Sequence, residues 1–345
     1  MAENKSKIKG KQSVLFEHAP YIIGYSSVAG KKEGEGPLGN YFDLIDEDPF
    51  FGMKTWEEAE SKMQKTACEM AIQKAGLQSS DIRYLFGGDL LGQLIATSFG
   101  IVTLNIPLFG IYGACSTMGE GLSLASMAID GGFAEKTIAV TSSHFAGAEK
   151  QFRFPLAYGN QRPYAATWTV TGSGSVVLSK TNTEQGIGVQ VKGVTTGKVI
   201  DFGLKDSMNM GACMAPAACD VIEANLKDLN RQPSYYDKII TGDLGSVGAQ
   251  ITKDIMKEKG YDISEQYMDC GMEIYDTQEQ DTHAGGSGCG CSAITLTGYV
   301  LEMMRRKEWS RVLFIPTGAL LSPTSFNEGQ SVPGIAHGVV LEGSN

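Results

Sequence analysis

Four short landmarks occur twice in this chain of 345 residues, in the same order in each half. Such a repeat constrains the fold more than any single motif, because a chain that repeats its landmarks repeats its architecture. The sequence therefore predicts an α/β fold of two similar halves, with residues 1–180 as the N-terminal half and residues 181–345 as the C-terminal half. The landmarks are a segment that ends in Gly-Asp-Leu at 86–90 and 240–244, a Cys-Ser pair among small residues at 113–116 and 288–292, an apolar strand at 137–140 and 312–315, and a segment that ends in Val-Val-Leu at 174–178 and 337–341.

Expected strands and helices alternate along each half, which is typical of layered, mostly parallel α/β proteins. One helix has clear limits, since Thr55 can cap its N-terminus, Glu58 follows three residues later and Gly76 can end it. The region 144–168 is expected to be irregular. Strands are expected at 21–28, 84–86, 107–112, 137–140, 187–194, 238–241 and 311–316, and helices at 55–75, 90–101, 116–129, 216–229, 246–259 and 293–306.

The charge and the apolar content of the chain argue against two classes of partner. The net charge is −10, and no basic stripe offsets it, so nucleic acid is not expected to bind. No apolar run reaches the roughly 18 residues of a membrane span, and no apolar segment follows the basic N-terminus, so no signal peptide is expected either. We expect a soluble, cytoplasmic chain whose seven cysteines are thiols.

Cys115 is the candidate reactive residue, because it ends an expected strand and opens a helix of small residues. The dipole and the free N–H groups at a helix N-terminus favour a thiolate, so the pKa of Cys115 is expected to fall. The same N–H groups could hold an oxyanion or a carboxylate. The alternative is that Cys115 is a small buried residue that packs beneath the helix.

The motifs around Cys115 resemble those of the thiolase superfamily, which includes the thiolases and the ketoacyl synthases. The run Tyr-Gly-Ala-Cys-Ser-Thr at 112–117 resembles the nucleophile turn of these condensing enzymes, and 171–178 resembles their Gly-rich hairpin. The resemblance covers nearly the whole chain. It implies a duplicated thiolase fold in a layered α/β/α/β/α arrangement, with Cys115 at the nucleophile position.

Two partners of the nucleophile are missing from that pattern. The ketoacyl synthases have a His after the strand that corresponds to 237–241, where this chain has Gly242, and an Asn within the segment that corresponds to 286–292, which contains none. Condensation needs a proton-transfer partner and donors to an oxyanion. We therefore predict that Cys115 is a vestigial nucleophile and that the chain is not an enzyme. The alternative is an active condensing or acyl-transfer enzyme that uses acyl-coenzyme A, with Cys115 as nucleophile and His283 as base.

A closer resemblance is to the stage V sporulation protein AD family, from about residue 12 to the end. It is carried by the run Asp-Thr-His-Ala-Gly-Gly-Ser-Gly-Cys-Gly-Cys-Ser at 281–292 and by Pro-Thr-Gly-Ala-Leu-Leu-Ser-Pro at 316–323. This resemblance implies that the chain binds dipicolinic acid (pyridine-2,6-dicarboxylate), with or without calcium, and takes part in its uptake into the developing spore. It implies membrane-embedded partners of the same uptake system and a peripheral place on the cytoplasmic side of the spore inner membrane. The thiolase fold implies a homodimer.

The aromatic and cationic region 144–168 is the strongest candidate for binding a planar dianion, which needs flat faces and paired donors. The alternative is a dimer interface, where aromatic residues and arginine are also enriched. The pocket is expected between the two halves, where the helices that follow Cys115 and Cys291 begin. The residues predicted to bind the ligand are Cys115, His144, Arg153, Arg162, His283, Ser287 and Ser292.

Cys289 and Cys291 form a Cys-x-Cys pair. This pair is a weak metal signal, because a closed zinc site needs two further ligands at suitable spacing. The sequence therefore predicts neither a metal site nor a cofactor.

Overall fold

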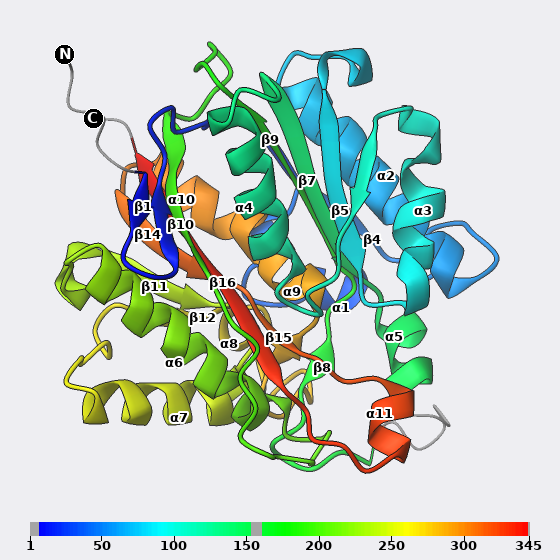
Figure 1. The fold of residues 1–345 in the computed structure, drawn as a ribbon. Coiled ribbons are helices and arrows are strands. Elements are labelled where there is room, and N and C mark those ends of the chain that lie inside the picture. Colours follow the sequence, from blue (N-terminus) through cyan, green and yellow to red (C-terminus); the bar gives the residue numbers. More distant parts are fainter. Residues whose placement is uncertain (1–6, 153–160, 344–345) are drawn as a thin grey trace.

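Ten strands, five from each half of the chain, form the main path of a 14-stranded sheet (Figure 1). The structure is a computed structural model that describes residues 7–152 and 161–343. The two runs of five strands are joined by one residue pair, Tyr21 with Gln190. From that junction outward, the first run is β3 (Tyr21–Gly30), β9 (Gly172–Ser179), β7 (Lys136–Ser143), β5 (Tyr84–Asp89) and β6 (Leu108–Gly110), and the second is β10 (Val189–Thr196), β16 (Gly334–Gly343), β14 (Arg311–Ile315), β11 (Lys238–Thr241) and β12 (Tyr267–Asp269).

Both runs have the same strand order, which is first, fifth, fourth, second, third along each half of the chain. They also have the same directions, since the two inner neighbour pairs are antiparallel and the two outer pairs are parallel. This repeat confirms the predicted duplicated α/β fold. The division at residue 180, which falls between β9 and β10, stays a prediction. Short strands complete the structure: β1 (Ile8–Lys9), β2 (Ser13–Leu15), β4 (Leu44–Asp46) and β15 (Thr317–Ala319) join the main sheet, and β8 (Trp168–Thr169) pairs with β13 (Gly286–Ser287).

The helices form three layers, one between the two runs of strands and one on each outer face (Figure 1). In the middle layer, α4 packs on β5 and β7 of one run and on β10 and β16 of the other, and α9 packs beside it. The predicted α/β/α/β/α layering is therefore confirmed. The helices are α2 (Trp56–Lys74), α3 (Ile95–Ile101) and α5 (Phe145–Phe152) beside the first run, α6 (Met210–Asp228) and α7 (Gly245–Glu258) beside the second, α4 (Thr117–Asp130), α9 (Cys289–Ile294), a π-helix (Thr295–Val300) and α10 (Leu301–Arg305) inside, and the short α1 (Lys31–Gly34), α8 (Cys270–Glu273) and α11 (Pro323–Asn327).

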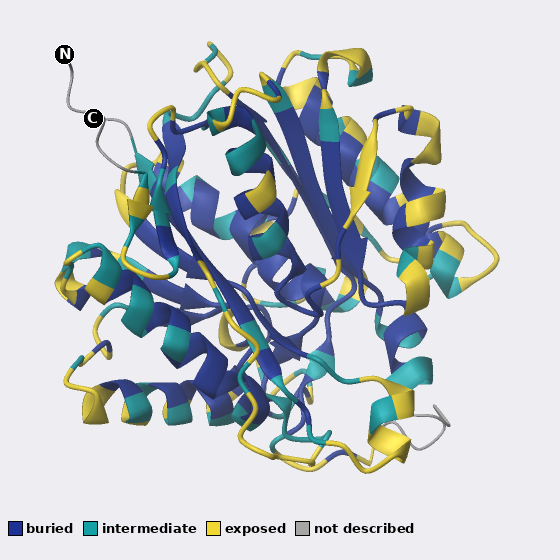
Figure 2. Cartoon of the chain, viewed as in Figure 1, coloured by how far each residue is buried: buried dark blue, intermediate teal, exposed yellow. Residues whose placement is uncertain are grey.

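Most of the middle layer is buried: α9 is dark blue in Figure 2, whereas α4 has teal and yellow positions among its buried ones. Strand β9 is buried at every position, because helices cover both of its faces. Small side chains on α4, among them Gly119 and Gly121, let the two sheets approach the helix closely. In the part of the chain that the structure describes, no helix is both long enough and apolar enough to cross a membrane.

Helix α2 begins and ends where the sequence predicts. The Thr55 side chain caps its N-terminus, accepting a hydrogen bond from Glu58 N at 3.2 Å. The helix ends before Gly76, whose φ of 68° is a left-handed conformation that glycine adopts without strain.

Two predicted helices begin elsewhere. Helix α3 begins at Ile95 instead of residue 90, because Gln93 and Leu94 have left-handed φ values of 55° and 56°. The Asp89 carboxylate holds this turn by accepting the N–H of Leu91 at 2.8 Å. Helix α6 begins at residue 210 instead of 216, because the Asn209 side chain caps it by accepting the N–H of Ala212 at 3.3 Å, and Pro216 lies inside the helix.

The region 144–168 was expected to be irregular, and this expectation is wrong for its first part. Residues 145–152 form α5, and β8 follows at 168–169. The side chain of Thr171 accepts a hydrogen bond from the first helical residue, Phe145 N, at 3.0 Å. This hydrogen bond fixes the start of α5 against the residues that follow β8, so that α5 and β8 lie side by side.

Candidate functional site

Cys115 lies in a strained turn between β6 and α4. The preceding residue, Ala114, has a φ of 49°, which is costly for a residue with a Cβ atom. Two side chains hold the turn: Ser116 Oγ donates to Gly113 O, and Thr117 Oγ1 donates to Ala114 O, both at 2.6 Å. The turn places the Cys115 side chain, which is 7% exposed, in a cavity between the two halves.

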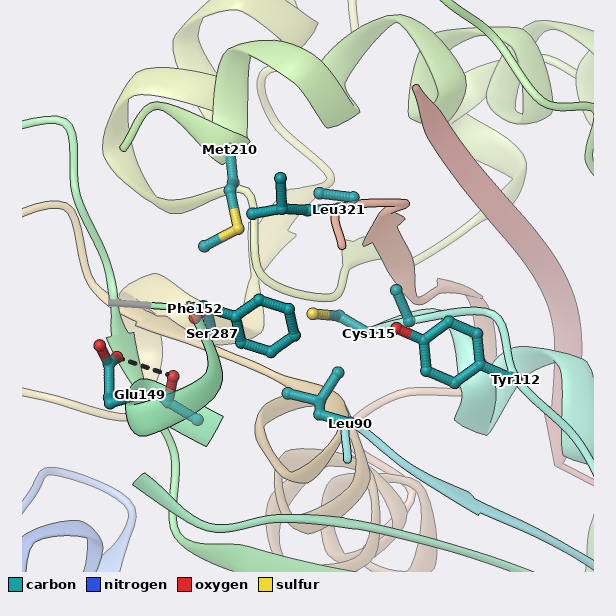
Figure 3. Close-up of a pocket in the computed structure, with 11 residues that line it drawn as sticks. Leu90, Tyr112, Cys115, Glu149, Phe152, Met210, Ser287 and Leu321 are labelled. Atoms are coloured by element: carbon teal, nitrogen blue, oxygen red, sulfur yellow. Dashed lines mark hydrogen bonds between the residues drawn. The ribbon is translucent and has the colours of Figure 1, made fainter. Parts of the chain in front are cut away.

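The cavity beside Cys115 is narrow, with a volume of about 40 Å³. Figure 3 shows the sulfur of Cys115 facing the ring of Phe152, with Leu90 below and Leu321 above. Two larger grooves of about 280 and 290 Å³ share Phe152 and Leu321 with the cavity. These two side chains therefore separate the cavity from the outside. The cavity is lined by Leu90, Tyr112, Ala114, Cys115, Glu149, Phe152, Thr169, Met210, Ser287, Ala319 and Leu321.

Asp243 is buried close to Cys115, and its carboxyl interacts electrostatically with the thiol. Its Oδ2 accepts the N–H of Gly288 at 2.9 Å, and its Oδ1 accepts the hydroxyl of Thr317 at 3.0 Å. Gly288 is the residue before α9, so its N–H is one of the donors that a helix N-terminus could offer to a ligand. A carboxylate of the protein already occupies that donor.

The expected fall in the pKa of Cys115 is wrong. Burial raises the pKa of the Cys115 thiol well above its ordinary value, and the neighbouring carboxyl of Asp243 raises it further. The N–H of Gly288 lowers it by less. The thiol is therefore protonated at neutral pH, although it lies close to a helix N-terminus.

Asp243 is itself shifted by the same surroundings. Burial raises the pKa of its carboxyl to about 7, and the bonds from Gly288 and Cys115 only partly oppose this. A second buried carboxyl, Asp269, adds repulsion, and its own pKa is raised to about 6 by burial. The acid behind Cys115 therefore changes charge near neutral pH.

Hydroxyl groups supply the polar atoms of the cavity. Thr169 Oγ1 donates to Glu149 Oε1 at 3.0 Å, the dashed line in Figure 3. Burial raises the pKa of Tyr112, so its hydroxyl stays protonated. Ser287 is 3% exposed and lies across the cavity from Tyr112, as Figure 3 shows. The cavity is thus an apolar slot with a few hydroxyl groups and one carboxyl, Glu149, in its lining.

Of the residues predicted to bind a ligand, Cys115 and Ser287 line the cavity. His144 does not: its Nε2 is bonded to Pro49 O at 2.8 Å, and its Nδ1 accepts the N–H of Gly147 at 3.4 Å. Burial also lowers the pKa of His144 and keeps the ring neutral. Ser292 is fully buried inside α9 and is not among the lining residues.

The cationic candidates lie away from the cavity. Arg162 donates through Nη2 to Asp281 O at 2.8 Å and lies 4.6 Å from the centre of the Trp168 ring. His283, the candidate base, contacts Pro163 O at 3.0 Å and the Asp281 carboxylate at 3.2 Å. Neither side chain lines the cavity beside Cys115. Arg153 lies outside the described residues.

Both thiols of the Cys-x-Cys pair, Cys289 and Cys291, donate hydrogen bonds to backbone carbonyl oxygens. Cys289 Sγ donates to Ala114 O at 3.0 Å, and Cys291 Sγ donates to Gly242 O at 3.5 Å. Burial raises the pKa of both thiols well above the ordinary value. Within residues 7–152 and 161–343, no three His, Cys, Asp or Glu side chains come together as metal ligands would.

The residues that sequence reasoning missed are chiefly Asp243, Glu149 and Phe152. Asp243 was visible as part of the repeated Gly-Asp-Leu landmark, next to the Gly242 that was noted for the absence of a His. Glu149 and Phe152 are on α5 at i and i+3, and a helical reading of 145–152 would have placed them on one face.

Solved structures of similar fold define the class of this protein. 3-Oxoacyl-[acyl-carrier-protein] synthase III from Aquifex aeolicus VF5 aligns with 94% of this chain and 99% of its own, at a TM-score of 0.57 and 13% identity. OleA from Xanthomonas campestris with bound cerulenin aligns with 95% of this chain and 97% of its own, at a TM-score of 0.58 and 14% identity. The fold is therefore that of the thiolase-like ketosynthases.

The sequence itself identifies a narrower group. The family model of stage V sporulation protein AD (SpoVAD) matches residues 10–342. Stage V sporulation protein AD of Bacillus subtilis (strain 168) is 46% identical over 336 residues, which cover 97% of this chain and 98% of that protein. The chain belongs to the stage V sporulation protein AD family, as its motifs predicted.

Proposed function

We propose that this sporulation protein binds dipicolinic acid and takes part in its uptake into the spore, and that it does not catalyse condensation. The observation that carries the second half of this proposal is the place of Asp243. Burial and the nearby Asp243 carboxyl keep the Cys115 thiol protonated, and the same carboxyl accepts the N–H of Gly288. A condensing enzyme needs the reverse, which is a reactive thiolate and free donors for an oxyanion.

The Cys115 cavity and its groove suit a flat, polar-edged ligand. Leu90, Phe152 and Leu321 offer apolar surface to an aromatic ring, and Tyr112 and Ser287 offer hydroxyl donors to carboxylates. The cavity alone is too narrow for a ring, whereas small-molecule pockets usually measure about 300 Å³ or more. Rotation of Phe152 and Leu321 would join it to the neighbouring groove of about 280 Å³.

Calorimetric titration of the purified protein with dipicolinic acid, beside acetyl-coenzyme A, tests this proposal. We expect saturable binding of dipicolinic acid and none of the thioester, in the presence and absence of calcium. A variant that fills the cavity, Ala319→Leu, should weaken binding by about tenfold or more, because overpacking excludes the ring. Thermal melts of the variant control for misfolding.

Intact mass after incubation with acyl-coenzyme A tests the alternative function, an active acyl transferase. The cavity lies where the fold places a nucleophile, so the alternative has a definite prediction, namely a stoichiometric acyl adduct that disappears in Cys115→Ala. We expect no adduct, because the buried thiol is protonated. An adduct would overturn the non-catalytic half of the proposal.

The remaining partners are also proposals. We propose that the chain works beside membrane-embedded proteins of the same uptake system, at the cytoplasmic side of the spore inner membrane. The absence of a spanning helix from the described residues is consistent with a peripheral role.

A further inference from the structure

A second hollow of about 390 Å³ lies against α5 and β8, the elements that also line the Cys115 cavity. The two residues of β8 face different hollows: Thr169 lines the cavity, and Trp168 lines the second hollow. This alternation is the ordinary geometry of a strand. The walls of the second hollow are Lys31, Lys32, Pro49, Phe145, Trp168 and Thr171, with Gly30 and three glutamates described below.

Lys32 is the group that makes this hollow a site. Its Nζ donates to Gln280 O at 2.6 Å and lies 4.6 Å from the centre of the Trp168 ring. Within the described residues, the ammonium group of Lys32 forms no ion pair with a carboxylate, so an anion could take that place. Burial lowers the pKa of Lys32, and nearby Arg162 lowers it further, whereas the carboxyls of Glu33, Asp281 and Glu35 oppose the shift without reversing it. A half-buried cation of this kind is stabilised by an anion that enters beside it.

The other walls add a donor and flat apolar surface. Thr171 Oγ1 accepts the N–H of Phe145 at 3.0 Å, and within the described residues its own hydrogen has no acceptor. Phe145 and Trp168 are stacked, with ring centres 4.0 Å apart and planes inclined by 10°. A planar ring can extend this stack or lie along its edge, with its carboxylate toward Lys32 and Thr171.

Three glutamates of this hollow oppose an anion only weakly. Glu33 is buried, and its carboxyl is turned inward to Thr171 N and the Tyr275 hydroxyl. Glu35 is exposed and lies 3.9 Å from Lys31. Glu47 is exposed at the rim, where solvent screens it. The cation inside the hollow is therefore the ammonium group of Lys32, which within the described residues makes no ion pair with these carboxyls.

We propose that this hollow is a second binding site, which takes a flat aromatic carboxylate with Lys32 as the partner of the carboxylate. Dipicolinic acid belongs to this class of ligand, so the inference extends the proposed function. It does not depend on binding beside Cys115. Because α5 and β8 line both hollows, a ligand in one site changes the wall of the other.

Fluorescence of Trp168 reports on this site directly. The chain has three tryptophans, so Trp56→Phe with Trp309→Phe leaves Trp168 as the single reporter. Dipicolinate and isophthalate, which lacks the ring nitrogen, are the two probes. We expect a saturable change with both probes, and a loss of affinity of about tenfold or more in Lys32→Ala, as for a desolvated charge partner. Lys31→Ala is the matched control, expected within about twofold because that lysine is exposed and already paired.

The outcomes separate this site from the one beside Cys115. The second site is supported if the fluorescence change of Trp168 persists in Ala319→Leu and is lost in a folded Lys32→Ala variant. This holds whether or not the cavity beside Cys115 binds dipicolinate. Calorimetric binding of dipicolinate without a Trp168 response leaves the proposed function standing and overturns the second site. A response that is equal in Lys32→Ala and Lys31→Ala, or absent with both probes, also overturns it.

Discussion

At the scale of single residues, the pair of Cys115 and Asp243 carries the proposal that this chain does not catalyse condensation. A helix N-terminus alone would lower the pKa of a thiol. Burial and a neighbouring carboxyl act in the opposite direction, and here they are the stronger effects. The turn at Ala114 is strained, yet the thiol that follows it is protonated at neutral pH.

Asp243→Asn should change how stability depends on pH. The folded pKa of Asp243 is about 7, whereas an unfolded Asp titrates near 4. Between these two pKa values, Asp243 keeps its proton in the native state but has lost it in the unfolded state. The free energy of unfolding therefore falls by roughly 2–4 kcal/mol as the pH rises from about 4 to about 7. The asparagine variant should lack this loss, because its amide stays neutral and can still accept from Gly288 N.

Urea unfolding of the wild type and Asp243→Asn at about pH 5 and pH 8 measures the effect. Asp254→Asn, which removes an exposed carboxylate from α7, is the matched control and should follow the wild type. Equal pH slopes for all three proteins would contradict the assignment of a proton to Asp243.

The sequence located Cys115 but not its partner. Gly113–Thr117 is a local motif, so residue types and spacing were enough to predict the turn. Asp243 is distant in the chain, and it reaches Cys115 only because the middle layer brings the two halves together. Burial, which decides the pKa of both groups, is a property of that packing and has no local signal.

At the scale of elements, the sequence predicted the limits of a helix correctly where residues at its own ends mark them. Helix α2 has a capping Thr55 and a left-handed Gly76, and both limits were found. Helix α3 begins late because the Asp89 carboxylate accepts the N–H of Thr97 at 2.8 Å and fixes the turn before the helix. Helix α6 begins six residues before its predicted start, at the Asn209 cap, and packing on β16 carries it past the interior Pro216.

Thr55→Ala should lower the free energy of unfolding by about 1 kcal/mol, because Glu58 N loses its side-chain acceptor. Thr66→Ala, in the middle of the same helix, is the control; it removes a β-branched residue and should be neutral or slightly stabilising. Urea unfolding of both variants gives the comparison. A cap variant as stable as Thr66→Ala would show that tertiary packing alone fixes the start of α2.

At the scale of the whole molecule, one edge of the sheet is exposed and apolar. Strand β6 ends the strand path, and all three of its residues are exposed, as its yellow colour in Figure 2 shows. Monomeric proteins usually protect such an edge. Exposed apolar side chains surround it: Ile95, Phe99 and Val102 near α3, and Leu108, Phe109 and Tyr112 on and after β6.

We propose that a second copy of the chain covers this edge, as the thiolase resemblance implied. A strand at the end of a sheet can pair with its own copy about a twofold axis, and the apolar side chains beside it would then be buried symmetrically. Tyr112 also lines the Cys115 cavity, so the interface would adjoin the proposed binding site. Dimerisation would therefore limit how far that wall of the cavity can move.

Phe99→Glu should convert the dimer to a monomer, because it places a charge in the centre of the apolar surface. Phe99 is 69% exposed in the single chain, so the substitution should leave the fold intact. Phe202→Glu is the matched control, since Phe202 is 71% exposed and lies in the loop between β10 and α6, in the other half of the chain. Sedimentation velocity should give a dimer for the wild type and Phe202→Glu, and a monomer for Phe99→Glu. A monomeric wild type, or a Phe99→Glu variant that still sediments as a dimer, would leave β6 as a free edge and place any interface elsewhere.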